Sequence, residues 1–256
     1  MKLTFLGTGT SQGVPVITCP CGVCHSDDSR DRRLRTSALV TTDGGMNVLF
    51  DIGPDFRQQM LRESVTHLDA ILITHAHRDH VAGIDDIRPF NYTQQRAMEV
   101  FANEVAAAEL RRAYHYIFAA HLYPGLPEVN LHVVDEPFVA AGERVVPIRA
   151  LHKDLPVLGY RMGPLAYITD ANHIDDSELE KMKGVQVLVV NALRREKHFS
   201  HFCLSEALEV VERVRPERAF LTHMSHEMGF HDQVQSTLPA HVRLAYDGLV
   251  VEIGSR

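Results

Sequence analysis

The sequence has no tryptophan, few cysteines and no long apolar run. A helix that crosses a membrane needs about 20 consecutive apolar residues, and no stretch of this chain comes near that length. The N-terminal MKLTFLGTGT reads as the start of a strand, because it lacks the apolar core and the cleavage site of a signal peptide. We therefore expect a cytoplasmic protein without a membrane partner.

An excess of positive charge is also missing. The chain has 26 Lys and Arg against 33 Asp and Glu, a formal net charge of −7. This balance argues against general attraction to nucleic acid or to anionic lipid, so an anionic substrate has to be attracted locally. With 256 residues, 45% of them hydrophobic, the chain can bury one large core. We expect a single domain over residues 1–256.

Short apolar segments bounded by Gly, Asp or Asn predict strands throughout the chain, and helical patterns alternate with them in the second half. This pattern is typical of a layered α/β fold. The segment 103–118 has helix-favouring composition, with Asn103 as a candidate N-cap. GTGTSQGVP, after the first strand, lacks the Lys-Ser/Thr ending of a P-loop, so a tight structural turn is favoured over a phosphate cradle. The expected strands are 3–6, 38–41, 48–50, 70–74, 131–134, 145–150, 158–161, 166–169, 185–190, 219–222, 242–245 and 249–253, and the expected helices are 103–118, 176–182 and 204–214.

The densest chemistry lies in ILITHAHRDHVAGIDD, directly after a buried strand. This segment places His75, His77, Asp79 and His80 within six residues. Alternate residues of an extended chain point the same way, so the first two histidines can hold one ion while Asp79 and His80 turn toward a neighbouring position. Imidazole and carboxylate ligands suit zinc, manganese or iron, and a site without thiolate leaves room for a reactive water.

Cysteine is scarce but crowded. Cys19, Cys21 and Cys24 lie together in TCPCGVC, whereas Cys203 stands alone. In a cytosolic chain such crowding indicates metal ligation before disulfides. Cys203 is a rival fourth ligand, although its place beside a helix start favours burial as a small apolar side chain.

THAHRDHVAGIDD resembles the H-x-H-x-D-H signature of the metallo-β-lactamase superfamily of dinuclear metallohydrolases. The resemblance implies a four-layer αβ/βα sandwich, with two mixed sheets face to face and helices outside. The later ligand positions follow in the expected order, as His152 in RALHKD, Asp170 in YITDA and His223 in FLTH. By this resemblance one ion is held by His75, His77 and His152, the other by Asp79, His80 and His223, and both by Asp170. The ions are Zn²⁺ or Mn²⁺, with Fe²⁺ as a further option.

Within that superfamily the sequence resembles the phosphodiesterases of carbon–phosphorus lyase pathways, which hydrolyse a phosphoribosyl cyclic phosphate. Those enzymes carry a structural zinc on C-x-C-x-x-C and on a histidine three residues after the last catalytic ligand. The resemblance therefore implies a closed Zn²⁺ site made by Cys19, Cys21, Cys24 and His226, in a loop at about residues 18–26. The alternative is three unligated thiols. The two histidines of LTHMSH would thus serve different ions.

Other candidate residues complete the expected site. His201, with His198 as the alternative, resembles the histidine that protonates the leaving group, and Asp79 is the second residue that we expect to be catalytic. Either histidine could instead cap a helix or face solvent. Asp51 and Asp247 end apolar strands and are candidates to orient the ligand histidines, or are turn formers. Arg33 and Arg35 could bind a substrate phosphate, or be solvated.

The expected function is hydrolysis of a small or cyclic phosphodiester by a hydroxide shared between the two ions. The alternatives are an acyl hydrolase (thioesterase or lactonase), a nuclease like those that process tRNA 3′ ends, and a non-catalytic binding protein of cofactor biosynthesis. The nuclease is disfavoured because the chain lacks a basic arm. The expected partner is the small-molecule substrate, with a homodimer left open. The segment 88–129 is expected to be a helical insertion that forms either a wall over the substrate or added core.

Overall fold

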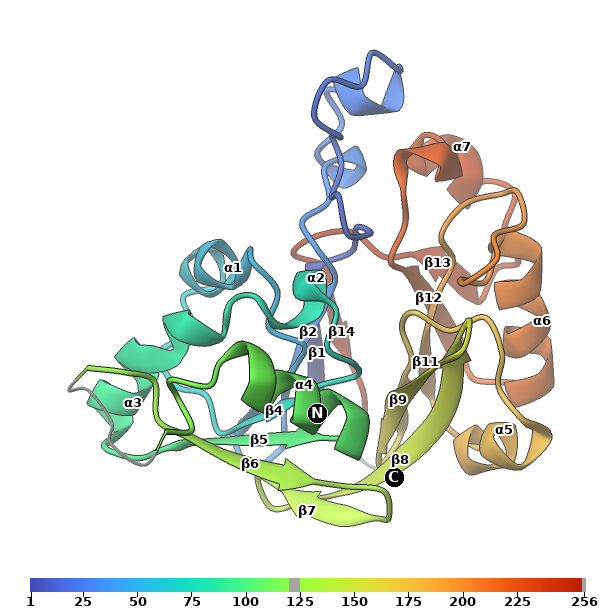
Figure 1. The fold of residues 1–256 in the computed structure, drawn as a ribbon. Coiled ribbons are helices and arrows are strands. Elements are labelled where there is room, and N and C mark those ends of the chain that lie inside the picture. Colours follow the sequence, from blue (N-terminus) through green and yellow to red (C-terminus); the bar gives the residue numbers. More distant parts are fainter. Residues whose placement is uncertain (120–124, 255–256) are drawn as a thin grey trace.

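The computed structural model describes residues 1–119 and 125–254. Within them, two seven-stranded sheets pack face to face and helices cover their outer sides (Figure 1). This arrangement confirms the four-layer αβ/βα sandwich that the resemblance implied. Among the described residues, no helix is long and apolar enough to cross a membrane.

The first sheet has the order β14-β1-β2-β3-β4-β5-β6. Its pairs are antiparallel from β14 to β3 and parallel from β3 to β6. The strands are β1 Lys2–Gly7, β2 Ser37–Thr41, β3 Asn47–Phe50, β4 Ala70–Leu72, β5 Met98–Ala102, β6 Val129–Val133 and β14 Val250–Glu252.

The second sheet has the order β13-β12-β11-β10-β9-β8-β7. It is antiparallel from β7 to β10 and parallel from β10 to β13, so it repeats the pattern of the first sheet. The strands are β7 Phe138–Ala140, β8 Glu143–His152, β9 Leu155–Met162, β10 Leu165–Tyr167, β11 Val187–Asn191, β12 Arg218–Thr222 and β13 Val242–Leu244.

Helices cover the outer face of each sheet. Those packed on the first sheet are α1 Phe56–Arg62, α2 Arg78–Val81, α3 Arg88–Gln94 and α4 Glu104–Ala113. Those packed on the second sheet are α5 Asp176–Met182, α6 Leu204–Val214 and α7 His231–Gln235. The short 3₁₀ turns are η1 Val23–His25, η2 Ser29–Asp31, η3 Ile84–Ile87 and η4 His226–Met228.

Three apolar clusters fill the spaces between these layers. Successive side chains of a strand point to opposite faces, so one strand serves two clusters. In β3, Val48 and Phe50 enter the cluster between the sheets, whereas Leu49 packs under the helices of the first sheet. In β11, Val189 faces the other sheet and Leu188 faces the outer helices. Burial on both faces explains why these strands read as continuous apolar runs.

The segment 88–129 differs from the expected helical insertion. It contains α3, α4 and also β5, which pairs in parallel with β4 on one side and β6 on the other. Part of the segment is thus core. Asn103 caps α4 as predicted, accepting a hydrogen bond from the Ala106 N–H at 2.7 Å. The Pro and Gly of YPGLPEV, residues 123–129, are typical of a turn, and its first two residues belong to the segment 120–124, which lies outside the described residues.

The N-terminal segment between β1 and β2 extends from one edge of the sandwich, at the top of Figure 1. Its glycine-rich start makes a tight turn, in which the Gly13 N–H donates to Thr10 O at 2.8 Å and Gly13 has a φ of +66°. This geometry matches the structural turn favoured from the sequence. The rest of the segment carries the cysteine cluster.

Candidate metal centre

The candidate ligands gather where strands end, at the edge of the sandwich that α2 occupies in Figure 1. His75 follows β4, His152 ends β8, Asp170 follows β10 and His223 follows β12. Loops beyond strand ends are free of ladder hydrogen bonds, so their side chains can converge on a ligand. Asp79 and His80 lie in the short helix α2, and His77 is its N-cap residue.

These residues form two groups in which all candidate ligand atoms lie within 4.8 Å of one another. Asp170 belongs to both groups, so the seven residues predicted as ligands are brought together. The first group is His75, His77, His152 and Asp170, and the second is Asp79, His80, Asp170 and His223.

Asp170 divides its two oxygens between the groups. Its Oδ1 lies 3.0 Å from His223 Nε2 and 3.4 Å from His80 Nε2, whereas its Oδ2 lies 3.7 Å from His75 Nε2. Asp79 faces only the second group, with its Oδ2 3.1 Å from His80 Nε2. A carboxylate with one oxygen in each group is placed to bridge two cations.

Asp51 orients two of the histidines, as its position at the end of β3 suggested. His80 Nδ1 donates to Asp51 Oδ2 at 2.7 Å, which leaves His80 Nε2 facing Asp79 and Asp170. The Thr74 hydroxyl donates to the same carboxylate at 2.9 Å and lies 3.0 Å from His75 Nδ1, so it can accept from that imidazole. These bonds select the tautomers that leave Nε2 free for a metal.

Ser200 was not identified from the sequence, because it acts through its backbone. His152 Nδ1 donates to the Ser200 carbonyl oxygen at 2.7 Å, across 48 residues of sequence. That bond turns His152 Nε2 toward the first group. A backbone carbonyl has no residue-type signal, so only the structure shows this contact.

The buried polar atoms of the site fit divalent cations. His80 Nε2 and His223 Nε2 are buried and have no hydrogen-bond partner in the described structure. Burial lowers the pKa of His223, but the facing Asp170 carboxylate outweighs burial and raises that pKa to about 9. The donor set is imidazole and carboxylate, as zinc, manganese and iron prefer. The site therefore has the ligand atoms and the negative charge that a cation would neutralise.

The backbone at this site is held in unusual conformations. Asp51, Asp170 and His223 have φ angles of +59°, +54° and +57°, in the left-handed region that non-glycine residues rarely adopt. Such conformations are costly and concentrate at functional sites. Each of the three residues lies just beyond a strand end, so the sheet fixes the strained backbone on one side.

Two glycines bring α2 against the loop after β3. A Cβ on Gly53 would lie 2.1 Å from Asp79 O, and a Cβ on Gly83 would lie 2.3 Å from Gly53 O. The space without side chains lets the Ile52 N–H donate to His80 O at 2.7 Å. No local pattern in the sequence indicates that these glycines position Asp79 and His80 of α2.

His201 lies beside the carboxylate of Asp170. Its Nε2 is 3.3 Å from Asp170 Oδ2, and burial lowers the pKa of its imidazole. His198 is farther out, with its Nδ1 3.3 Å from His201 Nδ1. Of the two candidates, His201 is therefore the one placed beside the proposed reaction centre.

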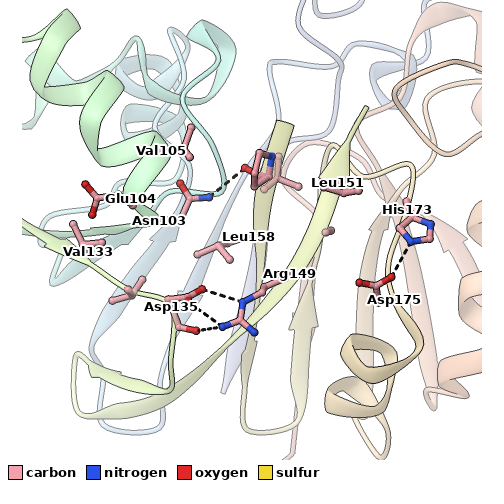
Figure 2. Close-up of a pocket in the computed structure, with 14 residues that line it drawn as sticks. Asn103, Glu104, Val105, Val133, Asp135, Arg149, Leu151, Leu158, His173 and Asp175 are labelled. Carbon is pink, nitrogen blue, oxygen red and sulfur yellow. Dashed lines mark hydrogen bonds and ion pairs between the residues drawn. The ribbon is translucent and has the colours of Figure 1, made fainter. Parts of the chain in front are cut away.

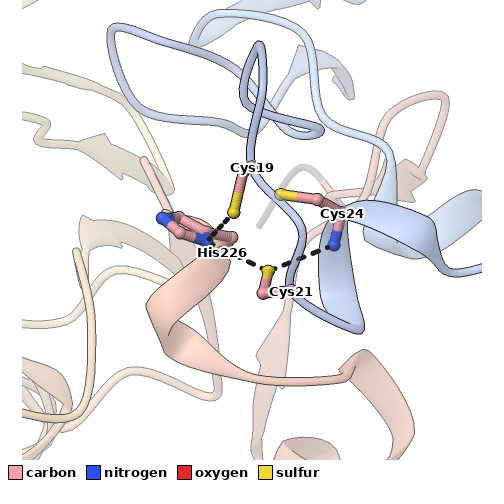
Figure 3. A group of neighbouring side chains, drawn as sticks. All are labelled: Cys19, Cys21, Cys24 and His226. Atoms are coloured by element: carbon pink, nitrogen blue, oxygen red, sulfur yellow. Dashed lines mark hydrogen bonds between the residues drawn. The ribbon is translucent and has the colours of Figure 1, made fainter.

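The second candidate metal site joins the N-terminal loop to η4 (Figure 3). His226 Nδ1 lies 3.4 Å from Cys19 Sγ and 3.2 Å from Cys21 Sγ, and Cys24 completes a group within 4.8 Å. The His226 hydrogen bond and the Cys24 backbone N–H lower the pKa of Cys21 to about 6, whereas burial raises that of Cys24 to about 11. Thiolate is the form that binds metal, so Cys21 is already prepared for it. Cys203 is buried as the N-cap residue of α6 and is not part of the group.

Arg33 and Asp247 do not have the roles considered from the sequence. Arg33 is only 2% exposed and pairs with Asp31 at 3.3 Å, so it is not available to a substrate phosphate. Arg35 pairs with Asp55 at 3.1 Å, but its side chain is 33% exposed, so phosphate binding by Arg35 stays a prediction. Asp247 accepts from the Thr8 hydroxyl and the Leu34 N–H, both at 2.8 Å, instead of orienting a ligand histidine. These polar groups stabilise the base of the N-terminal segment.

Known proteins share this architecture. One crystal structure, described as a new diphosphatase from the PhnP family, matches 99% of this chain and 98% of its own with a TM-score of 0.91 and 38% identity. The structure of Zn²⁺-bound PqqB from Methylobacterium extorquens matches 99% and 100% of the two chains with a TM-score of 0.80, and its 18% identity shows the fold alone.

The sequence relatives include an octanoyltransferase and a protein of coenzyme PQQ synthesis. An octanoyltransferase of Porphyromonas gingivalis is 40% identical over 252 residues, which are 97% of this chain and 51% of that protein, so the chain spans about half its length. Coenzyme PQQ synthesis protein B of Methylobacterium radiotolerans is 27% identical over 220 residues, 74% of this chain and 72% of that protein. A family model described as a β-lactamase superfamily domain matches residues 46–224. Because this model matches more than half of the chain, the chain belongs to the β-lactamase superfamily, and its two ligand groups at strand ends give it the architecture of a metal-dependent hydrolase.

Proposed function

We propose that the chain hydrolyses a phosphodiester bond in a small molecule, with two divalent cations held by the two ligand groups that share Asp170. The observation that carries the proposal is the division of the Asp170 oxygens, one toward His80 and His223 and the other toward His75. Cations bound there would supply a water of lowered pKa as the nucleophile and would polarise the phosphoryl oxygens.

The residues of the chain have separate tasks in this reaction. Asp51 and the Ser200 carbonyl hold the imidazoles of His80 and His152 in their ligand tautomers. His201, beside Asp170, is placed to give a proton to the departing oxygen. The cysteine group with His226 would hold a structural Zn²⁺ that ties the N-terminal segment to the loop after β12.

The relative described as a diphosphatase supports a phosphorus–oxygen bond as the target. A diphosphate also presents a phosphoryl group with an oxygen leaving group, so the same residues suit either bond. The net charge of −7 favours a small molecule over RNA, which would need a basic surface.

Metal analysis combined with a substrate screen tests the proposal. We expect three metal ions per chain and turnover of a cyclic or linear phosphodiester, or of a diphosphate diester. Asp79→Ala should abolish turnover and keep the thiol-bound zinc, whereas Asp176→Ala, on the exposed start of α5, should change neither. Full activity in Asp79→Ala would refute the assignment.

A second candidate is hydrolysis of an acyl bond, which the octanoyltransferase relative favours. The same nucleophile can attack a carbonyl carbon, and the ligand set suits both reactions. That relative is about twice the aligned length, so its name can describe the half that this chain does not match. Comparing turnover of bis(p-nitrophenyl) phosphate with that of p-nitrophenyl octanoate separates the two candidates.

A further inference from the structure

An open groove runs from the first ligand group along α4 (Figure 2 shows its outer part). It consists of two adjoining hollows, of about 570 and 650 Å³, which share Glu104, Val105 and Pro156. The inner hollow is bounded by His75 and His77, and the outer one lies between the start of α4, the end of β6 and the β8–β9 hairpin. We call the two together the α4 groove.

The groove gathers apolar side chains that are exposed. Val105, Val133 and Leu151 line it and are 48%, 43% and 38% exposed. They are three of the nine large apolar side chains that are exposed in the described part of the chain. Single exposed apolar residues are ordinary, but a cluster in a concave surface marks a binding site.

The charges of the groove do not suit an anion. Arg112 is paired with Glu109 at 2.8 Å, and Arg149 with Asp135 at 3.0 Å. Among the described lining residues, no arginine or lysine remains without an acidic partner. A phosphate in the groove would also face the carboxylate of Glu104. An uncharged chain fits this lining better than a sugar phosphate or a nucleotide.

The inner hollow of the groove reaches the metal-ligand residues His75 and His77, which connects the groove to the proposed reaction. His75 and His77 belong to the first ligand group and also line the inner hollow, so a substrate whose reacting group lies at these ligands can extend into that hollow. The part of the substrate that lies along α4 then determines its affinity. Val105 and Pro156 line the junction of the two hollows together with Glu104, and Leu155 adds an aliphatic wall to the inner hollow.

We propose that the α4 groove binds an unbranched aliphatic chain of the substrate, so that the natural substrate is a phosphoric ester of an aliphatic alcohol. The reaction in this inference rests on the proposed function, whereas the aliphatic part of the substrate is inferred from the α4 groove alone. The metal ligands recognise the phosphoryl group of the substrate, and the groove selects the length of its aliphatic chain.

Substrates with alkyl groups of different length test the proposal. We expect the KM of the metal-loaded enzyme to fall along the series from methyl to octyl p-nitrophenyl phosphate. A fully buried methylene would lower KM about fourfold and a half-buried one about twofold, so the seven additional methylenes of the octyl ester should lower its KM about 100-fold relative to the methyl ester. Equal KM values along the series would overturn the proposal.

Substitution at the groove locates the effect. Val105 is the second residue of α4, where an acidic side chain is compatible with the helix dipole, so Val105→Asp should fold. In that variant the ratio of methyl to octyl KM should fall toward one. Val139→Asp, on β7 and outside the lining residues, is the matched control and should keep the wild-type ratio. Equal ratios in the two variants would contradict the assignment to α4.

A binding measurement separates this inference from the proposed reaction. If no phosphodiester is hydrolysed, the proposed function fails, and calorimetry with octyl phosphate and methyl phosphate still tests the groove. Tighter binding of octyl phosphate that Val105→Asp abolishes and Val139→Asp retains would support the groove. Equal binding of the two phosphates to the wild-type chain would overturn it.

Discussion

The hydrogen bond between Asp51 and His80 allows a sharp test of the metal centre. Asp51 is fully buried and accepts from His80 Nδ1 at 2.7 Å, from the Thr74 N–H at 2.8 Å and from the Thr74 hydroxyl at 2.9 Å. Asp51→Asn keeps the shape and one acceptor oxygen. If that oxygen faces Thr74, the amide N–H₂ faces the N–H of His80, and the imidazole must change tautomer or move.

The loss of the Asp51–His80 hydrogen bond sets the size of the expected change in metal affinity and in stability. A tautomer with the proton on Nε2 has no lone pair for a metal, so affinity at the second ligand group should fall about 10- to 100-fold, about 1.4 to 2.7 kcal/mol. Loss of a hydrogen bond to a buried charge should also lower the free energy of unfolding of the metal-free protein by about 1.5 to 3 kcal/mol. Titration with Mn²⁺ or Zn²⁺ against a chelator measures the first effect, and urea unfolding measures the second.

Asp69→Asn is the matched control. Like Asp51, Asp69 is a buried carboxylate next to a strand, and it accepts from the Asn47 N–H at 2.7 Å and pairs with Arg96. Among the described interactions, it contacts no residue of either ligand group. It should lower stability and leave metal affinity unchanged. An unchanged affinity in Asp51→Asn, or an equal loss in both variants, would refute the role of Asp51.

Four further variants test separate parts of the structure. His201→Asn should lower turnover about 10²- to 10⁴-fold and retain the metals, as measured by kinetics and elemental analysis. Cys24→Ser should remove one zinc per chain and lower the thermal midpoint, because a closed thiolate site stabilises the fold. Gly53→Ala places a Cβ 2.1 Å from Asp79 O, so it should cost about 1 to 3 kcal/mol of stability and weaken metal binding. Burial raises the pKa of Asp247 to about 6, so its contribution to the free energy of unfolding is present below about pH 4 and is lost as the pH rises through 6. Asp247→Asn should remove this loss of stability, which amounts to at most about 3 kcal/mol in unfolding experiments at different pH.

Controls for these variants lie in the same chain. Cys203→Ser should keep the zinc content, because Cys203 is buried away from the thiol cluster. Gly254→Ala should be neutral, because a Cβ there would meet nothing within 4 Å. Turnover by His201→Asn at the wild-type rate would exclude His201 as the general acid. Unchanged zinc content in Cys24→Ser would exclude Cys24 as a ligand.

Local patterns predicted much of the fold. The helices α5 and α6 have the bounds expected from their periodicity, and every strand expected from a short apolar run is present within a few residues. By contrast, β5 and β7 were not predicted. β5 lies between two parallel strands, so its place depends on pairing with β4 and β6, which no local signal encodes.

The sequence by itself determined the ligands that are neighbours in the chain. His75, His77, Asp79 and His80 form a pattern because one strand end and one helix turn bring them together. His152, Asp170 and His223 were found only by resemblance, because the residues between them encode strands and helices and carry no metal signal.

The tertiary structure decided everything that depends on which strand ends meet. Asp51 and Asp247 have the same local context, yet only Asp51 lies beside a ligand histidine, because β3 is next to β4 in the sheet. Arg33 has the charge to bind a phosphate, but the packing of the N-terminal segment buries it against Asp31. Charge and residue type are properties of the chain, whereas distance, burial and the choice of partner exist only once the two sheets have packed.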